Sequence, residues 1–295
     1  MQKISYCLWF DTNAEEAAKF YTATFDHSSI GMTSRYSKAS AAASGRPEGS
    51  PMMVTFHLDG EEFMGLNGGP VFKFTPAISF FVACNTEDEI DRLYRRLSEG
   101  GSVLMELNKY PFSEKFGWVN DQFGVSWQLN LAVKAQKISP ALMFIGDKHG
   151  KAEEAVNFYA SKFKNSHVVN IARYGAESGE QEGRVSHAVF SLNGQEFIAM
   201  DSGIDHAFSI TPAISFVCPC ETQEEIDYLW NTLSSDGGAP EQCGWLTDKY
   251  GVSWQIIPSI LGKLMTNPER SEKVMSAMMQ MTKLDIATLQ QASNQ

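Results

Sequence analysis

The sequence has too little positive charge for a protein that binds phosphate backbones. Its 295 residues include 24 Lys and Arg against 35 Asp and Glu, which gives a formal net charge of −11. An acidic chain repels nucleic acids and anionic lipid surfaces, and no cluster of basic and aromatic residues offsets that repulsion. We therefore expect neither nucleic acid nor a membrane surface as a partner.

Long apolar runs and closely paired cysteines are also missing. No run approaches the roughly 20 apolar residues that span a bilayer, and the first residues lack the basic and apolar regions of a secretory signal. The five cysteines are an odd number scattered along the chain, a pattern typical of reduced thiols. Cys218 and Cys220 lack the spacing of redox or zinc motifs and are expected to be buried. We expect a cytoplasmic protein.

What the sequence does contain is an internal repeat. Residues 14–25 and 152–163 agree at seven of twelve positions. Two further segments recur unchanged, TPAISF at 75–80 and 211–216 and GVSWQ at 124–128 and 251–255. Because all three occur in the same order in both halves, the pattern indicates a tandem duplication. We predict copy one over residues 1–134, copy two over 138–258, and a helical tail over 259–295.

Each copy divides again into two strand-helix-strand-strand-strand modules, which predicts an α+β fold. In copy one the first module has strands expected at 4–10, 29–36, 52–58 and 61–66, and the second at 77–83, 103–107, 116–120 and 125–131. Helix starts are indicated by Asn13, Thr86 and Thr222, each followed three residues later by Glu as in a capping box. We expect the two modules of one copy to share a sheet, so that residues 1–134 fold alone.

Alternation along the strands separates a helix-packing face from a second face. In the strand over 77–83 the large residues Ile78, Phe80 and Val82 share one side, and Ser79 lies on the other. In the strand over 125–131, Ser126 and Gln128 likewise oppose the apolar residues. We expect the face with the polar residues to be the inside of a curved sheet, which is a natural small-molecule pocket.

Several of these segments together resemble one known family. They are NAEEAAKFY at 13–21, GGP at 68–70, TPAISFFV at 75–82, GW at 117–118 and DQFGVSWQ at 121–128, with GWLTDKYGVSWQ at 244–255 in copy two. In this order they resemble the PhnB-like proteins of the vicinal-oxygen-chelate superfamily, which includes glyoxalases, bleomycin-resistance proteins and dioxygenases. The resemblance covers residues 4–131 and 138–258, and it implies paired modules that form a cupped mixed sheet.

Many members of that superfamily hold a divalent metal with His or Glu from the opening and closing strands of the modules. The resemblance maps those positions onto Tyr6, Met64 or Gly65, Ala77 and Gln128 in copy one, and onto Pro140, Ile198 or Ala199, Ala213 and Gln255 in copy two. Only the glutamines among them could ligate through a side-chain carbonyl oxygen, and a metal needs several converging ligands. We predict that the metal site is absent and that no cofactor is used.

One branch of the family is named 3-demethylubiquinone-9 3-methyltransferase. The sequence has no Gly-x-Gly-x-x-Gly turn after a strand and no doubly wound pattern that would hold an adenosyl cofactor, so its residues do not support methyltransferase activity. The candidate pocket residues are Tyr6, Ser79, Trp118, Ser126 and Gln128 in copy one, and Ser215, Trp245, Ser253 and Gln255 in copy two. No catalytic residue can be assigned.

Three functions remain open. The favoured one is a pocket for an unidentified small molecule on the inner sheet face, used for binding or for a reaction without metal. The alternatives are a metal-dependent lyase or dioxygenase and a non-catalytic interaction module. His57 and His187 are expected to be strand-edge residues that meet solvent. The chain is expected to be either a monomer that imitates a dimer or a homodimer.

The two copies differ in their loops. Residues 37–50 are rich in Ala, Ser and Gly and are expected to be mobile. Copy one inserts residues 102–116 where copy two has only 239–243, so we expect the copy-one cup to be more enclosed and preferred by a ligand. The tail has methionines at helical spacing after Asn267 and a second helix start at Asp285. We expect it to dock on copy two, where that copy lacks a strand.

Overall fold

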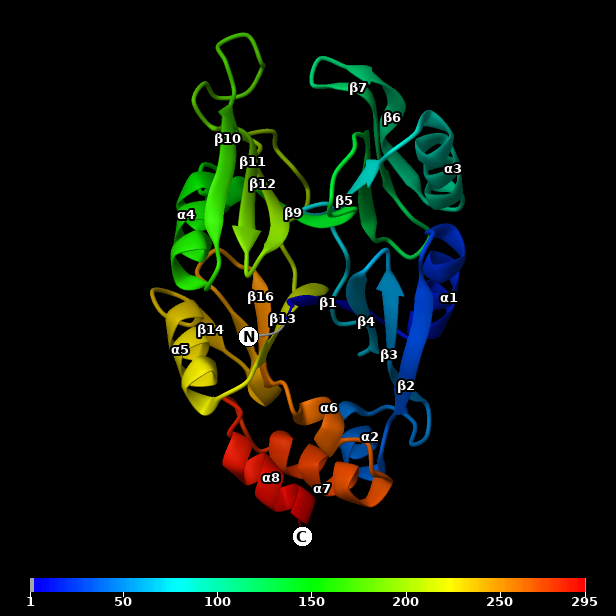
Figure 1. Cartoon of the computed structure of the whole chain (residues 1–295), viewed down its shortest axis with the longest axis vertical. Coiled ribbons are helices and arrows are strands. Elements are labelled where there is room, and N and C mark those ends of the chain that lie inside the picture. Colours follow the sequence, from blue (N-terminus) through cyan, green and yellow to red (C-terminus); the bar gives the residue numbers. More distant parts are fainter. Residues whose placement is uncertain (1–2, 295) are drawn as a thin grey trace.

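The computed structural model describes residues 3–294, without the side chains of residues 268 and 269. Two eight-stranded mixed sheets stand one above the other, with pairs of helices along both outer sides and a helical tail at one end (Figure 1). The predicted α+β architecture of tandem βαβββ modules with a C-terminal helical tail is confirmed. None of the helices within residues 3–294 has the length and apolar character needed to cross a bilayer.

The lower sheet, sheet A, has the strand order β14-β15-β16-β13-β1-β4-β3-β2. Its strands are β1 (Ser5–Phe10), β2 (Ser29–Arg35), β3 (Pro51–Leu58), β4 (Glu61–Asn67), β13 (Ile214–Cys220), β14 (Ala239–Pro240), β15 (Trp245–Thr247) and β16 (Ser253–Pro258). Two outer helices cover it, α1 (Ala14–Thr24) and α5 (Gln223–Leu233).

The upper sheet, sheet B, has the order β10-β11-β12-β9-β5-β8-β7-β6. Its strands are β5 (Ile78–Cys84), β6 (Ser102–Tyr110), β7 (Ser113–Asn120), β8 (Ser126–Leu131), β9 (Ile138–Phe144), β10 (His167–Arg173), β11 (Val185–Leu192) and β12 (Gln195–Asp201). Helices α3 (Glu87–Ser98) and α4 (Ala152–Lys162) cover its outer face, and the single-turn helices η1 (Gly146–Lys148) and η2 (Gln242–Gly244) lie in loops of copy two.

The expectation that the two modules of one copy share a sheet is wrong. Sheet A joins the first module of copy one to the second module of copy two through the antiparallel pair β1–β13. Sheet B joins the other two modules through β5–β9. The linker between the copies explains this arrangement, because the six residues after Leu131 span at most about 20 Å. Strand β9 must therefore begin close to the end of β8, and it pairs with the neighbouring β5.

The modules of one copy instead share a core between their helix-covered faces. Tyr21 of α1, above sheet A, donates its hydroxyl hydrogen to Asp121 Oδ2 at 2.7 Å in the loop before β8 of sheet B. Its ring lies 5.4 Å from that of Trp127. In copy two, Tyr159 contacts Asp248 and Trp254 in the same way. The buried core is therefore continuous from one sheet to the other.

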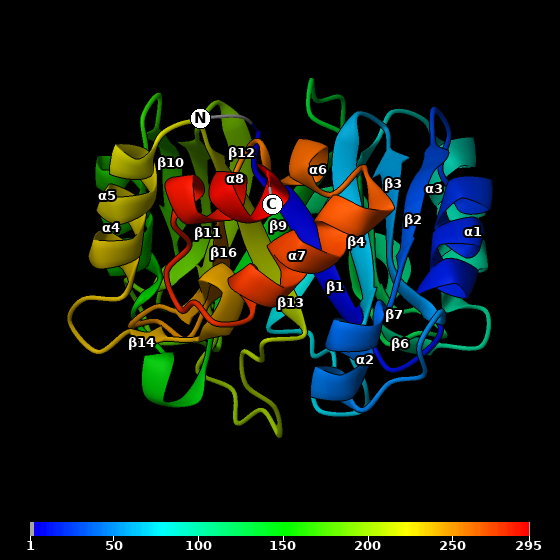
Figure 2. The same ribbon diagram turned by 90° about the horizontal axis from the view of Figure 1, so that it is seen from below.

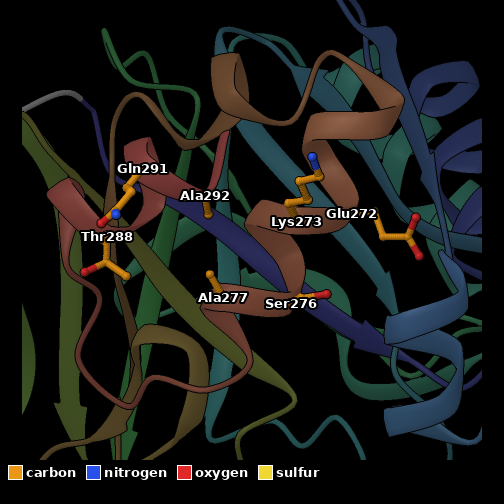
Figure 3. A pocket seen from close by; sticks show the side chains of 7 residues that line it. All are labelled: Glu272, Lys273, Ser276, Ala277, Thr288, Gln291 and Ala292. Carbon is orange, nitrogen blue, oxygen red and sulfur yellow. The ribbon is translucent and has the colours of Figure 1, made fainter. Parts of the chain in front are cut away.

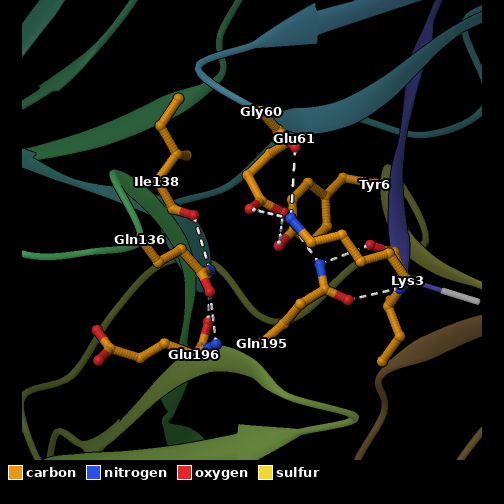
Figure 4. Close-up of polar contacts among 9 residues, drawn as sticks. Lys3, Tyr6, Gly60, Glu61, Gln136, Ile138, Gln195 and Glu196 are labelled. Atoms are coloured by element: carbon orange, nitrogen blue, oxygen red, sulfur yellow. Dashed lines mark hydrogen bonds and ion pairs between the residues drawn. The ribbon is translucent and has the colours of Figure 1, made fainter.

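Polar contacts join the two copies near the pseudo-twofold axis (Figure 4). Gln195, which opens β12, accepts a bond from the backbone N–H of Ile4 at 2.6 Å and donates to its carbonyl at 2.9 Å. The same amide donates to Glu61 Oε2 at 3.0 Å. Glu61, which opens β4 and is 4 % exposed, also pairs with Lys3 at 2.9 Å. Each buried group in this network therefore has a partner.

The helix caps follow the sequence in two of three cases. Thr86 and Thr222 accept bonds from the backbone N–H groups of Glu89 and Glu225 at 3.2 and 3.3 Å. Asn13 makes no cap bond with its side chain. The N–H group of Ala14 is satisfied instead by Asn67 Oδ1 of β4 at 2.9 Å, so a tertiary contact replaces the predicted local one.

The segment over 37–50 contains a helix that the sequence did not indicate, α2 (Lys38–Ser44), which begins at the N-cap Ser37. The tail has three helices, α6 (Leu261–Leu264), α7 (Pro268–Met278) and α8 (Ile286–Asn294). Helix α7 contacts α2 and crosses in front of β1 and β4 at the open end of sheet A (Figure 2). Helix α2 and the tail, which have no helical counterpart in the other copy, thus meet at sheet A.

The predicted docking of the tail on copy two is confirmed. Val274, Leu284 and Leu289 are buried in a cluster that also contacts Ile257 of β16. The N–H groups of Cys243 and Gly244 donate to the tail carbonyls of Met281 and Thr282, at 2.8 and 2.7 Å. A side chain at Gly244 would lie 3.1 Å from Leu284, so glycine allows this close approach. The tail thus covers the part of copy two where β14 and β15 replace the longer β6 and β7.

Candidate functional site

Each sheet curves around the face that points away from the helices, and this inner face carries most of the candidate residues. We call the inner face of sheet A cup A and that of sheet B cup B. Cup B contains Ser79, Trp118, Ser126 and Gln128, and cup A contains Ser215, Trp245, Ser253 and Gln255. Because each sheet combines modules of both copies, each cup also receives residues from the other copy.

The glutamines make the same contact in both cups. Gln128 Nε2 of β8 donates to Ser79 Oγ of β5 at 2.9 Å. Gln255 Nε2 of β16 donates to Ser215 Oγ of β13 at 3.0 Å. In both cases the two strands are parallel neighbours. The duplication has therefore preserved a polar pair at the floor of each cup.

The second serine of each cup behaves differently. In cup B the indole Nε1 of Trp118 donates to Ser126 Oγ at 2.8 Å. In cup A, Trp245 instead packs edge-on against Trp9, with ring centroids 6.1 Å apart. Ser253 Oγ is buried and has no hydrogen-bond partner among the described residues. The equivalent serines are thus satisfied in one cup and unsatisfied in the other.

Tyr6 does not line a cup. It is fully buried on the helix-covered side of β1, with its ring 5.1 Å from Phe63 and 5.4 Å from Phe80. Burial and the nearby Glu61 carboxylate raise the pKa of its hydroxyl well above the usual value. The neighbouring residue Cys7 points into cup A instead, because side chains alternate along a strand. Tyr6 therefore belongs to the core.

Cup B is largely filled by its own side chains. Phe81, Phe116 and Ile198 are buried together on the inner face of sheet B. Trp118 and Met200 pack against them. The polar and apolar groups that were expected to face a ligand are therefore mostly covered, and Gln128 itself is only 4 % exposed.

Cup A is less filled. Met64 and Gln255 are partly exposed, whereas the residues at the matching register positions of cup B, Ile198 and Gln128, are buried. Cys7 lies opposite Ser215, and burial raises the pKa of its thiol to about 11, against hydrogen bonds from Gln255 and Ser215. The thiol is thus a neutral group at neutral pH.

The two candidate histidines, His57 and His187, differ in their surroundings. His57 is exposed, as expected, and its Nε2 lies 4.0 Å from Glu62 Oε1. His187 is partly exposed but does not lie on an edge strand, because β11 stands between β10 and β12, and its ring is 6.2 Å from that of Phe81. Burial, and then the Lys134 charge, lower its pKa. Cys218 and Cys220 are buried, as expected.

The positions that correspond to metal ligands do not fit a divalent ion. Tyr6 is in the core, and the amide nitrogens of Gln128 and Gln255 are each committed to a serine. Within the described part of the chain, no three His, Cys, Asp or Glu side chains converge as a metal centre requires. The candidate residues of each cup offer hydroxyl, amide and indole groups, and only the glutamine amide oxygen among them is a metal ligand of the usual kinds.

Two buried aspartates outside the cups, Asp121 and Asp248, were not predicted from the sequence. Asp121 accepts bonds from Tyr21, from Trp127 Nε1 at 2.8 Å, and from the N–H groups of Phe123 and Val125. Burial raises its pKa to about 6, although these four donors oppose the rise. Asp248 repeats the arrangement in copy two. The recurrence of Asp before Gly-Val-Ser-Trp in both copies was the available signal, and the role of this carboxylate is to hold the last loop to the helix.

A groove of about 760 Å³ runs between α7 and α8 of the tail, and none of the candidate residues lines it (Figure 3). The side chains around it are Glu272, Lys273, Ser276, Ala277, Thr288, Gln291 and Ala292. Most of them are exposed, so the groove is a feature of the outer surface of the tail.

Comparison with known proteins finds similarity to this chain in both sequence and fold. The chain is 48 % identical to a putative 3-demethylubiquinone-9 3-methyltransferase, PhnB protein, from Bacillus cereus, over 44 % of this chain and 100 % of that one, with a TM-score of 0.41. It is 10 % identical to glyoxalase I from Zea mays, over 89 % of this chain and 96 % of that one, with a TM-score of 0.57. The second match shows that most of the chain shares the glyoxalase fold. No curated protein matches the chain significantly.

The family comparison covers both copies. The model described as 3-demethylubiquinone-9 3-methyltransferase matches residues 2–130 and again residues 136–257. Both matches fall on the copies that the internal repeat defines, and glyoxalase I shares the fold of the paired copies. The chain belongs to the 3-demethylubiquinone-9 3-methyltransferase family, whose unit it carries twice.

Proposed function

We propose that the chain binds a small organic molecule on the inner face of its sheets and does so without a divalent metal. The observation that carries this proposal is the Gln–Ser pair, which occurs at the same place in both cups. A concave sheet face with a few fixed polar groups among apolar side chains is typical of small-molecule sites. The ligand is held by hydroxyl and amide groups, and the purpose is binding, sequestration or a metal-free reaction.

The proposal does not include methyl transfer, although the family is named for a methyltransferase. Adenosyl cofactors of that class are commonly bound at the carboxyl ends of a doubly wound parallel sheet. Both sheets here are mixed, and the module helices α1, α3, α4 and α5 cover one face of each, while α7 of the tail lies over the other face of sheet A. The described residues therefore do not form the doubly wound arrangement in which that crevice occurs.

We also propose that the chain works as a monomeric pseudo-dimer. Each sheet is completed by modules of the two copies within one chain, so the pairing that a single-copy protein would obtain from a second subunit is already supplied. Size-exclusion chromatography with light scattering should give a mass near 32.7 kDa. A stable dimer mass would contradict this part of the proposal.

Ligand retention and metal binding test the main proposal. The chain, purified without chelator or affinity metal, is examined by native mass spectrometry, and it is then titrated with Zn²⁺, Ni²⁺, Mn²⁺ and Fe²⁺ by calorimetry. We expect an organic adduct, or binding from a fragment library, and no stoichiometric metal. One ion per cup at micromolar affinity would replace the proposal with the metal-dependent lyase or dioxygenase.

Matched variants locate the bound molecule. Gln128→Leu removes the amide from cup B, and Gln255→Leu removes it from cup A. We expect one of the two variants to weaken binding at least tenfold, which corresponds to about 1.4 kcal/mol, and the other to leave binding unchanged. Retention of full affinity by the double variant would show that the ligand lies elsewhere.

A further inference from the structure

The three helices of the tail form a cavity that is separate from both cups. It has a volume of about 250 Å³ and lies where α6, α7 and α8 meet, and none of the described residues that line it belongs to a strand. Water in the liquid takes up about 30 Å³ per molecule, so this space is large enough for a small metabolite. The groove between α7 and α8 that Figure 3 shows has different lining residues.

Two cationic side chains line this cavity, and no counter-charge accompanies them. Lys263 belongs to α6 and Arg270 to α7. Within the described part of the chain neither makes an ion pair, whereas Lys283 of the same tail pairs with Asp227 at 2.6 Å. The described lining residues include no Asp or Glu, although the chain carries a formal net charge of −11. The cavity therefore offers local positive charge in an acidic protein.

A hydroxyl group of α8 also opens into the cavity. Ser293 lines it and is only 6 % exposed, and its Oγ has no hydrogen-bond partner among the described residues. In the same part of the chain, the fully occluded side-chain atoms without a partner are Asn120 Oδ1, His149 Nε2 and Ser253 Oγ. Because Ser293 Oγ is not one of them, the small exposed surface of this residue includes its hydroxyl. A ligand atom in the cavity can therefore reach it, and a largely buried polar group gains from such a partner.

The other polar groups around the cavity are uncharged. Gln290 and Asn294 of α8 supply amide groups. The first turn of α7 is capped, because Asn267 Oδ1 accepts the backbone N–H of Arg270 at 3.2 Å. The donors that a ligand would meet are thus side-chain N–H and O–H groups, which are the partners of an anion with several acceptor oxygens.

We propose that this cavity binds a small phosphate monoester. A phosphate group has three acceptor oxygens and a charge of about −1.5 to −2, so the fork of Arg270 can hold two oxygens while Lys263 and the Ser293 hydroxyl hold the third. The organic part then lies against Ile260 and Leu264, the apolar residues of the lining. This inference does not depend on the proposed function, because the cavity lies outside both cups. Since the ligand contacts all three helices, its binding stabilises the packed tail.

Calorimetry on the full-length chain tests the proposal. The chain is titrated in about 0.15 M NaCl with phenyl phosphate and with inorganic phosphate, and with benzoate as the carboxylate counterpart. We expect saturable binding of one phosphate group per chain, with a Kd of about 1 mM or lower for phenyl phosphate and binding of benzoate at least about tenfold weaker. Hydrogen exchange should slow in α7 and α8 when phenyl phosphate is bound, and stay unchanged in β5 and β8.

Matched variants connect the binding to the cavity. Arg270→Gln and Lys263→Gln each remove one charge from it, and we expect about tenfold weaker binding in either. Lys273→Gln removes the same charge from α7, but Lys273 lines the other groove (Figure 3), so binding should be unchanged. Ser293→Ala should weaken binding about fivefold. The lysine and arginine side chains are exposed, so their variants keep the test valid even where Ser293→Ala loosens the tail.

Three outcomes would overturn the inference. A loss of affinity in Lys273→Gln equal to that in Arg270→Gln would show that the surface of the tail attracts anions as a whole. Binding of benzoate as tight as that of phenyl phosphate would exclude a site built for phosphate. If neither phosphate compound binds saturably, the cavity holds water alone. The proposed function stands in all three cases, because its test relies on ligand retention and on the glutamine variants of the cups.

Discussion

Cups A and B are built from the same modules, share the same Gln–Ser pair, and yet are closed in different ways. Cup B is filled from within, by Phe81, Phe116 and Ile198. Cup A has Val217 at the position of Phe81, and it is covered from outside by the tail. A duplicated fold can therefore keep its outer core unchanged while one inner face becomes packed and the other stays available.

Removal of the tail should have the largest effect and should act on one sheet. Deleting residues 264–295 exposes the apolar surface that buries Val274, Leu284 and Leu289. At about 1.5–3 kcal/mol for each fully buried side chain, we expect the unfolding free energy to fall by roughly 5 kcal/mol. Hydrogen exchange should accelerate in β13 and β16 and stay unchanged in β5 and β8. Equal acceleration in both sheets would mean that the tail does not stabilise sheet A selectively.

Truncation of the residue that fills cup B should come next. Phe81→Ala leaves a cavity in the buried cluster of sheet B, and such changes cost about 3 kcal/mol or more. The matching position in sheet A is Val217, where Val→Ala removes the equivalent of about two methylene groups, or roughly 1.6 kcal/mol. Urea denaturation of both variants measures the difference. Similar losses would indicate that the two inner faces are equally packed.

The outer core should respond alike in both copies. Asp121→Asn and Asp248→Asn each disrupt a buried carboxylate that accepts four hydrogen bonds. We expect each variant to lose about 2 kcal/mol, with the two values within about 0.5 kcal/mol of each other. A large difference between the two, measured by chemical denaturation, would show that divergence reaches beyond the inner faces.

The same aspartate gives a pH dependence with a definite sign. The pKa of Asp121 is raised from 3.8 to about 6 in the folded chain, so between about pH 4 and 6 the folded state binds more protons than the unfolded state. The contribution of this group to the unfolding free energy is present below pH 4 and is lost as pH rises through 6. Denaturation curves at pH 4.5 and 6.5 should show a smaller change in Asp121→Asn than in the unmodified chain.

The smallest effect should come from the two serines. Ser126→Ala breaks the bond from Trp118 and leaves a partly buried indole N–H group without its acceptor, which should cost about 1 kcal/mol. Ser253→Ala removes a hydroxyl that has no partner within the described chain, so the ligand-free protein should be unchanged or slightly more stable. Thermal denaturation of both variants decides this. A loss of stability in Ser253→Ala would reveal a partner for its hydroxyl within the protein.

The repeat and the strand faces could be predicted from the sequence because they depend on local spacing. Alternation placed Ser79 and Gln128 on one face, and the structure joins them by a hydrogen bond. The caps at Thr86 and Thr222 were predictable because both partners lie within one turn. These features need no knowledge of which strands become neighbours.

The exchange of modules between sheets could not be predicted, because periodicity gives the face of a strand and not its partner. Tyr6 was assigned to the pocket through the resemblance, and the structure places it in the core. The orientation of Trp245 depends on Trp9, which lies 236 positions earlier in the chain. Helix α2 lies in a segment of small residues whose order depends in part on contact with α7.

The contact between Gln195 and Glu61 has a consequence for how such a chain can evolve. The two residues open equivalent strands, β12 and β4, and meet near the pseudo-twofold axis at 3.0 Å. In a true homodimer an exact twofold axis would set a residue against its own copy, and two buried carboxylates would repel each other. Fusion of the two units into one chain allows the two equivalent positions to carry different residues. One position therefore holds the acid Glu61, and the other holds the neutral amide Gln195.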